Sequence, residues 1–146
     1  MPQSFDGTVA GNASVELQRR GDTIEEAYEF MLAYAAQGRQ TDKGGGSGSK
    51  VREHLNGMTA ALDGLGAAAT AAAAAVDREL PKAGQAFFAA VDNDARIALA
   101  ALRLVLARAD ISSQLIDNLN ASIHLRALLT DLFVVDEALR PSPARS

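Results

Sequence analysis

The apolar residues between positions 51 and 76 recur in alternating steps of four and three. Such heptad spacing places all of them on one narrow face of an α-helix. We therefore expect a single long helix over 51–76 whose apolar face packs against partner helices. The residues of this face are Val51, Leu55, Met58, Leu62, Leu65, Ala69, Ala72 and Val76.

The second half of this predicted helix carries no charged residue between Gly64 and Val76 and consists mainly of alanine. Small side chains let a neighbouring helix approach closely, so we expect this half to be surrounded by protein. The uncharged stretch is 13 residues long, shorter than the roughly 20 residues that a membrane-crossing helix needs. The sequence therefore predicts no membrane span here.

A shorter helix is predicted over residues 22–38. Asp22 and Thr23 precede Glu25 and Glu26 at the spacing of a capping box, which indicates a helix start, and Gly38 is a suitable stop. Residues 1–21 show neither helical nor strand periodicity, so we expect an extended or mobile arm. The apolar stripe of the helix comprises Ile24, Ala27, Tyr28, Met31, Leu32 and Ala35.

Two further helices are predicted toward the C-terminus. Pro81 cannot continue the preceding helix, which should end at Leu80. The apolar pattern resumes over 82–109, either as one helix of about 27 residues or as two segments with a cap at Asp94, and we favour one helix. Asp110 is the expected cap of a last helix, and Pro141 begins a polar tail over 141–146.

Residues 39–49 contain the run GGGSGS at 44–49. This composition is typical of a flexible linker without fixed structure. A run of this kind is equally consistent with a natural loop and with an engineered linker.

Together these segments predict an all-α fold in a single domain. The expected architecture is an antiparallel four-helix bundle with one short N-terminal helix and three long helices, the latter within residues 50–140. The short helix would leave part of the three-helix face uncovered, so we expect self-association. A core built from Ala, Leu and Val, with 5% aromatic residues, fits helix packing better than a sandwich or barrel.

Charge and cysteine content narrow the possible functions. The net charge of −4 disfavours nucleic acid as a partner, because phosphate binding needs a clustered basic face. The chain contains no cysteine, which removes disulfides and thiolate metal sites. The first residues have no apolar signal-peptide core, and we expect a cytoplasmic location without membrane association.

No catalytic constellation, cofactor site or metal site is expected. Neither histidine, His54 or His124, has a glutamate three residues before it, as a carboxylate-bridged metal bundle would require. The carboxylate pairs are interpreted as helix caps and solvated faces. These pairs are Asp92 with Asp94 and Asp136 with Glu137.

The segment His54-Leu55-Asn56-Gly57 resembles the phosphoacceptor region of histidine phosphotransfer domains, which are also helical bundles. The resemblance implies that His54 would accept the phosphoryl group. The segment departs from that family because Gly57 lies three residues after the histidine instead of four, and Asn56 stands where the family has lysine. The alternative interpretation is a histidine on a solvated helix face.

The leading hypothesis is a non-enzymatic helical protein–protein interaction module that binds a protein partner or a second copy of itself. Polar residues on an apolar helix face, such as Asn118 and Ser122, can specify register and partner. The alternatives are a phosphotransfer bundle that uses His54 and a ligand-binding bundle with a pocket near Met58, Phe87 and Phe88. The candidate interaction residues are Tyr28, Met31, Met58, Phe87, Phe88, Asn118 and Ser122.

Overall fold

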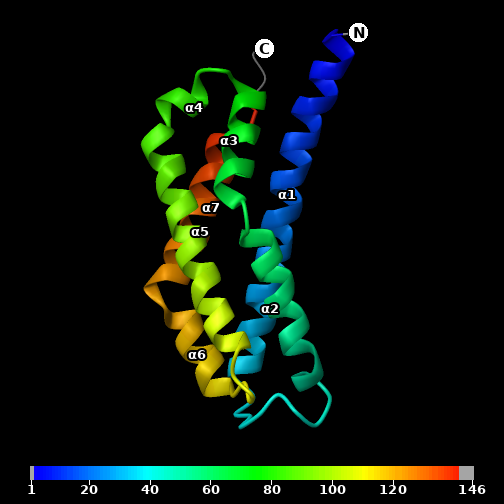
Figure 1. The fold of residues 1–146 in the computed structure, drawn as a ribbon, viewed down its shortest axis with the longest axis vertical. Coiled ribbons are helices and arrows are strands. Elements are labelled where there is room, and N and C mark those ends of the chain that lie inside the picture. Colours follow the sequence, from blue (N-terminus) through cyan, green and yellow to red (C-terminus); the bar gives the residue numbers. More distant parts are fainter. Residues whose placement is uncertain (1, 142–146) are drawn as a thin grey trace.

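The computed structural model describes residues 2–141, with side chains for residues 11–141. This part of the chain is all helical, as predicted, with seven helices and no strand (Figure 1). Residues 142–146 of the predicted tail lie outside it. The helices are α1 (Pro2–Ala35), α2 (Gly48–Leu62), α3 (Leu65–Val76), α4 (Leu80–Ala83), α5 (Gln85–Leu106), α6 (Ser113–Ala121) and α7 (Ile123–Ala138).

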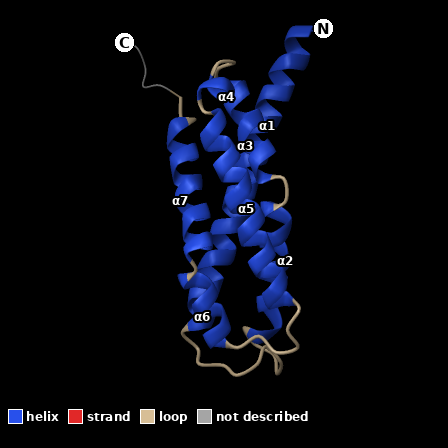
Figure 2. Cartoon of the chain, turned by 60° about the vertical axis from the view of Figure 1, so that its left-hand side comes forward, coloured by secondary structure: helices blue, strands red, loops and turns tan. Residues whose placement is uncertain are grey.

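The helices lie lengthwise beside one another (Figure 2). The chain runs down α1, returns along α2 and α3, crosses one end through α4, runs down α5 and returns along α6 and α7 (Figure 1). α1 packs on α2, α3 and α6, whereas α5 packs on α2, α3 and α7. The N-terminal end of α1 extends beyond the other helices (Figure 1).

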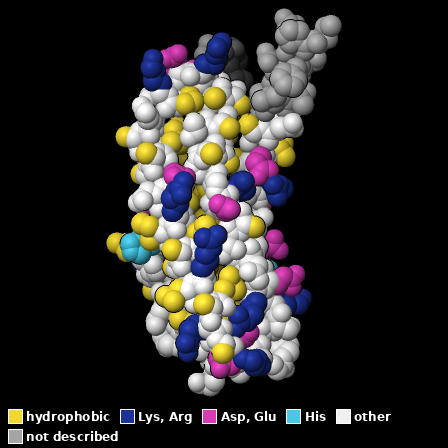
Figure 3. All heavy atoms as spheres, in the orientation of Figure 1, with side chains coloured by type: hydrophobic (Ala, Val, Ile, Leu, Met, Phe, Trp, Pro, Cys, Tyr) yellow, Lys and Arg dark blue, Asp and Glu magenta, His cyan; other side chains and the backbone are white. Residues whose placement is uncertain are grey.

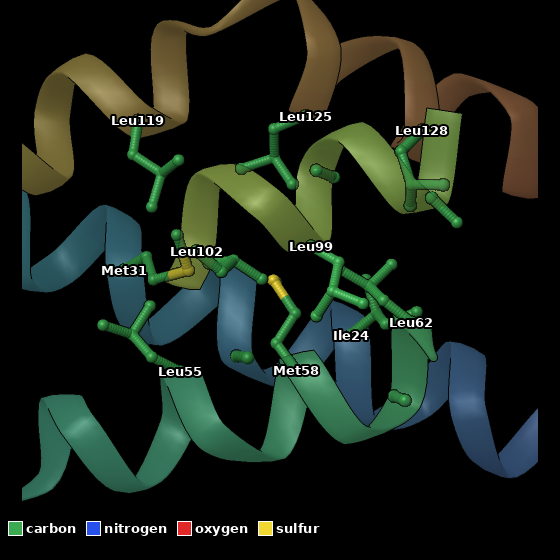
Figure 4. Close-up of a cluster of buried hydrophobic side chains, with 14 of the residues drawn as sticks. Ile24, Met31, Leu55, Met58, Leu62, Leu99, Leu102, Leu119, Leu125 and Leu128 are labelled. Atoms are coloured by element: carbon green, nitrogen blue, oxygen red, sulfur yellow. The ribbon is translucent and has the colours of Figure 1, made fainter. Parts of the chain in front are cut away.

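The core lies between these helices and consists of leucine, isoleucine, valine, methionine and alanine. Met31 from α1, Leu55 and Met58 from α2 and Leu102 from α5 meet at its centre (Figure 4), and each is fully buried. Apolar burial of this kind is the main favourable contribution to the stability of the fold.

The predicted long helix over 51–76 is broken, which corrects the sequence-based expectation. α2 ends at Leu62 and α3 begins at Leu65, and their axes differ by 53°. Gly64 has φ +82°, a conformation that glycine adopts without strain. The Arg20 guanidinium donates hydrogen bonds to the carbonyl oxygens of Ala61 and Asp63. Arg20 thus satisfies acceptors at the end of α2, which stabilises the break.

α1 corrects a second expectation, because the chain is helical from Pro2 where an arm over 1–21 was predicted. Gly21 lies inside the helix, so the predicted capping box after it does not start one. Glu16 accepts hydrogen bonds from both Arg19 and Arg20, and Leu17 packs against the core. These contacts offset the helix-breaking tendency of Gly21, which is about 1 kcal/mol relative to alanine.

Gly21→Ala is expected to stabilise the protein by about 1 kcal/mol, because a Cβ at this position meets no atom within 4 Å and alanine favours the helix. The measurement is urea unfolding followed by circular dichroism. Gly64→Ala is the matched control and should destabilise by about 1 kcal/mol, because its φ is +82°. A destabilised Gly21→Ala would show that α1 does not continue through residue 21.

The segment after α3 also differs in detail from the prediction. α3 ends at Val76, before Leu80, and Pro81 lies in the first turn of α4, where its missing N–H costs nothing. α5 runs without a break past Asp94, so the favoured single helix is confirmed within the bounds Gln85–Leu106.

The last predicted helix is divided at Ser122, which has an extended conformation with φ −58° and ψ 131°. Its hydroxyl accepts a hydrogen bond from the backbone N–H of His124, so it caps α7. Ser112 caps α6 by accepting from the N–H of Leu115. The predicted cap, Asp110, instead accepts hydrogen bonds from Thr41 and Lys43 in the loop after α1.

The glycine-serine run is less uniform than its composition indicates. Gly44, Gly45 and Gly46 all have positive φ, whereas Gly48 begins α2 and is buried. A Cβ at Gly48 would collide with the carbonyl oxygen of Asp42 and the guanidinium of Arg39. The end of the predicted linker is therefore the first turn of a packed helix.

A partly buried ion pair joins this loop to α2 and to the end of α5. Asp42 accepts a hydrogen bond from Arg52 Nε at 2.7 Å and another from the backbone N–H of Ile111 at 2.8 Å. Arg52 also donates to the carbonyl oxygens of Leu106 and Arg108, which lie at and beyond the end of α5. Burial opposes ionisation of Asp42, but these hydrogen bonds lower its pKa to about 2.

Three further hydrogen bonds join the end of α1 and the loop after it to the start of α6. The Tyr34 hydroxyl donates to the carbonyl oxygen of Ile111 at 2.6 Å. The Ser113 hydroxyl donates to the carbonyl oxygen of Tyr34 and accepts from the N–H of Arg39. The loops at this end of the molecule are thereby held in fixed positions relative to one another.

Taken singly, none of the helices described between residues 2 and 141 has the length and apolar content needed to cross a membrane. When α2 and α3 are counted together as one bent pair, their combined length and apolar content meet these two criteria.

Candidate functional site

An apolar groove lies where α4 and the start of α5 meet the end of α7. Its volume is about 240 Å³. Every lining residue is apolar or glycine, so the groove suits hydrocarbon groups. The lining residues are Leu80, Ala83, Gly84, Phe87, Phe88, Val134, Val135, Ala138 and Leu139.

The short turn between α4 and α5 positions the aromatic wall of this groove. A Cβ at Gly84 would lie 2.9 Å from the Phe88 ring, so glycine makes the room that the ring occupies. The rings of Phe87 and Phe88 have their centroids 6.3 Å apart at an interplanar angle of 59°. The wall is therefore formed by two adjacent, tilted rings of partly buried side chains.

The opposite wall comes from the last two turns of α7. Val135 is buried against the core, whereas Val134 is 48% exposed. The preceding residue, Phe133, is 62% exposed. Apolar side chains that remain this exposed side by side often indicate an interaction surface.

The surface around α3, α4 and the start of α5 is also rich in hydrophobic side chains (Figure 3). Lysine, arginine, aspartate and glutamate gather at the tip beyond it and over the other half of this face (Figure 3). The end of the molecule that carries the groove is therefore the more apolar end in this view.

Below the groove, two carboxyl groups face each other between α5 and α7. They belong to Asp94 and Asp131, which are both half-buried, and one carboxyl oxygen of Asp131 is buried without a hydrogen-bond partner. Burial raises the pKa of Asp131 to about 7, and the neighbouring Asp94 carboxyl contributes to the increase. Asp94 is therefore a half-buried residue inside α5 and not a helix cap, which corrects the interpretation from the sequence.

The predicted interaction residues fall into two groups. Phe87 and Phe88 lie in the groove, and Tyr28 is partly buried against the core. Met31 and Met58 are fully buried, which corrects their assignment to an interaction surface. The helical periodicity that identified them equally well describes core residues. Met58 consequently does not join Phe87 and Phe88 in one pocket.

The two polar candidates on the last helices have local partners. Asn118 is exposed and accepts a hydrogen bond from Gln114 at 3.0 Å, whereas Ser122 is the cap of α7. The buried polar residue of this region is Asn120, whose side-chain amide donates to the carbonyl oxygen of Met31 at 3.2 Å. Asn120 therefore joins α6 to α1.

The candidate phosphoacceptor His54 is partly buried on α2. Its ring stacks on Phe30 of α1, with the centroids 4.1 Å apart and an interplanar angle of 17°. A stack of this geometry gives the histidine a packing contact between two helices.

The α7 part of the groove and the carboxyl pair were missed by the sequence analysis. One signal was present, because Asp94 follows Phe87 by seven residues and Asp131 follows Leu128 by three. Each aspartate therefore interrupts an apolar face at helical spacing. A charged residue on such a face is a reason to look for a partner on a neighbouring helix.

Among the side chains that the structure describes, no three histidine, aspartate or glutamate residues are grouped so that they could hold a metal ion. No protein-family model, no curated protein and no solved structure matches this chain.

Proposed function

We propose that this chain is a non-enzymatic helical interaction module. In this proposal the helices form an antiparallel bundle of four rods, with α2 and α3 as one bent rod and α6 and α7 as another. The groove between α5 and α7 receives apolar side chains from a partner helix. The observation that carries the proposal is the uniformly apolar lining of this groove beside the exposed Phe133 and Val134.

The size and chemistry of the groove favour a helical partner. A volume of about 240 Å³ can hold two aliphatic side chains, and burial of each contributes about 1.5–3 kcal/mol. An amphipathic helix presents such side chains at positions i and i+3 or i+4, which is a common way of binding in an apolar groove. The partner would be a cytoplasmic protein or a second copy of this chain.

NMR titration of methyl groups with a synthetic amphipathic helix tests the groove. The peptide should carry leucine at positions i, i+3 and i+7. We expect the largest shifts at Val134, Val135 and Leu139, because these residues line the groove. Shifts confined to α1 and α2, or no saturable shift at millimolar peptide, would contradict the proposal.

Val134→Gln should weaken binding of this peptide at least tenfold, because it places a polar amide in the groove without adding a charge. Val15→Gln is the matched control, since Val15 is 66% exposed and does not line the groove. Equal affinities of the two variants would show that the peptide binds elsewhere. Light scattering over a range of protein concentrations separates self-association from binding of a different protein.

Two alternatives remain predictions. Phosphotransfer by His54 would be supported by acid-labile phosphate on the wild-type protein that is absent from His54→Ala. Binding of a small apolar molecule in the groove would be supported by a ligand-dependent thermal shift that Val134→Gln reduces.

A further inference from the structure

Asp94 and Asp131 each lie on a helix face whose neighbouring residues are apolar. Asp131 lies on α7 between Leu128 and Val135, which are three residues before it and four after it and are both buried. Asp94 occupies the equivalent place on α5, between Val91 and Ala98, which are also buried. Because α5 and α7 pack on each other, each carboxyl projects into their contact.

The carboxyl pair has no cationic partner among the described residues. Neither Asp94 nor Asp131 takes part in the salt bridges of the described part of the chain, and Asp131 Oδ2 is buried there without a hydrogen-bond partner. A buried oxygen without a partner is costly unless a proton or ligand satisfies it.

The other charged groups on the neighbouring helices have different surroundings. On α5, Asp92 and Arg96 pair with each other at 2.8 Å, and Arg103 is exposed. On α6, Asp117 is exposed. On α7 itself, the exposed charged residues are Arg126, Asp136 and Glu137, the last two paired with Arg140 after the helix. Asp94 is therefore the charged group that acts on Asp131.

Two neighbouring carboxylates cannot both ionise without strong repulsion where burial limits screening by water. With one proton between them, the protonated carboxyl donates a strong hydrogen bond to the ionised one. Loss of that proton to the solvent leaves two negative charges in an apolar contact. The contact then weakens or admits water.

We propose that Asp94 and Asp131 form a proton-sharing pair that closes the contact between α5 and α7 when singly protonated and loosens it when both carboxyls are ionised. This device goes beyond the proposed function, because it requires no partner in the groove. The pair lies next to the groove, since Val135 is one helical turn after Asp131 and lines the groove. A looser contact should therefore widen the groove.

The direction of the pH dependence follows from proton linkage. The pKa of Asp131 is raised from 3.8 to about 7 in the folded chain. Between these two values the folded state binds more protons than the unfolded state, so stability falls as pH rises. The loss is complete above about pH 7 and absent below about pH 4. Neutral pH lies at the upper end of this window, where a small change in pH changes the state of the pair.

Carboxyl carbon NMR of the wild-type protein tests the pair directly. We expect one aspartate resonance of the wild type to titrate near pH 7. The spectrum of Asp131→Asn should lack this resonance. Titration of every described aspartate near pH 4 or below would overturn the proposal. The titration should be repeated with EDTA and with millimolar Ca²⁺ or Mg²⁺. A pKa near 7 that falls several units with the ion would make the pair a cation site and also overturn it.

The stability profile provides the second readout. The unfolding constant of the wild type should rise by up to about tenfold per pH unit between pH 5 and 7 from this group. Asp131→Asn should remove that rise, because asparagine keeps a donor toward Asp94 but cannot ionise. Asp117→Asn, an exposed control on α6, should keep the wild-type profile.

If Asp131→Asn does not fold, Asp94→Asn removes the charge repulsion from the other helix and should reduce the rise without abolishing it, because burial is the larger cause of the raised pKa of Asp131. Identical pH profiles for the wild type and both variants of the pair would overturn the proposal. This outcome would leave the groove intact as a peptide-binding site, so the two proposals fail independently.

Discussion

Replacing Asp42 with alanine is expected to lower the free energy of unfolding by about 3 kcal/mol at pH 7, because the change leaves Arg52 without its counterion and the buried N–H of Ile111 without an acceptor. The side chain is 8% exposed, and it accepts hydrogen bonds from Arg52 and from the backbone of Ile111. Without it, the loop after α1 loses its hydrogen bonds to Arg52 and to the backbone of Ile111. Urea unfolding followed by circular dichroism measures the change.

The effect should depend on pH in a defined direction. The pKa of Asp42 is lowered from 3.8 to about 2 in the folded protein. Its contribution to stability is therefore present above about pH 4 and is lost as pH falls toward 2. The difference in stability between wild type and Asp42→Ala should shrink over that interval. A difference that stays constant from pH 7 to pH 2 would contradict the assignment of an ion pair.

Asp110→Ala is the matched control for Asp42→Ala. Asp110 pairs with Lys43 of the same loop, but both side chains are more than half exposed. Exposed ion pairs contribute little because water and salt screen them. The control variant should therefore be close to wild type in stability, and a loss as large as that of Asp42→Ala would show that burial is not the decisive factor.

Leu102→Ala is expected to destabilise the protein by about 3 kcal/mol, because it opens a cavity at the centre of the core. Leu102 is fully buried and lies among Met31, Leu55 and Met58 (Figure 4). Chemical denaturation with guanidinium provides the measurement. Leu104→Ala on the same helix is the control, because Leu104 is 70% exposed, and it should cost about 0.5 kcal/mol or less. Similar losses for the two variants would contradict the orientation of α5.

The spacing of apolar residues predicted burial better than it predicted helix continuity. Val51, Leu55, Met58, Leu62 and Leu65 are all buried, although a break follows Leu62. The spacing succeeded because a bend of 53° still leaves each segment with its own apolar face directed at the core. The local spacing of apolar residues predicts which side chains are buried, and it does so within each segment on either side of a break.

The break between α2 and α3 and the extra length of α1 depend on contacts between residues that are far apart in the sequence. The end of α2 is stabilised by Arg20, which lies 41 residues before Ala61. The same arginine, with Glu16 and Leu17, supports α1 through Gly21. No local pattern predicts such contacts, because they form only after α1 and α2 lie side by side.

The candidate site divides in the same way. The sequence identified Phe87 and Phe88 as large apolar residues near a turn, and both line the groove. The sequence could not identify Val134 on the opposite wall or the pairing of Asp94 with Asp131. Both depend on how α5 and α7 are aligned along their contact, which is not encoded in either segment alone.

By itself, the sequence determined that this chain is helical and most of the side chains that its core contains, because helical periodicity and apolar content act within a single segment. The tertiary structure decided where helices break, which polar residues are buried and which residues meet in the groove. These features depend on contacts between segments dozens of residues apart, and their free energy appears only when the helices pack together.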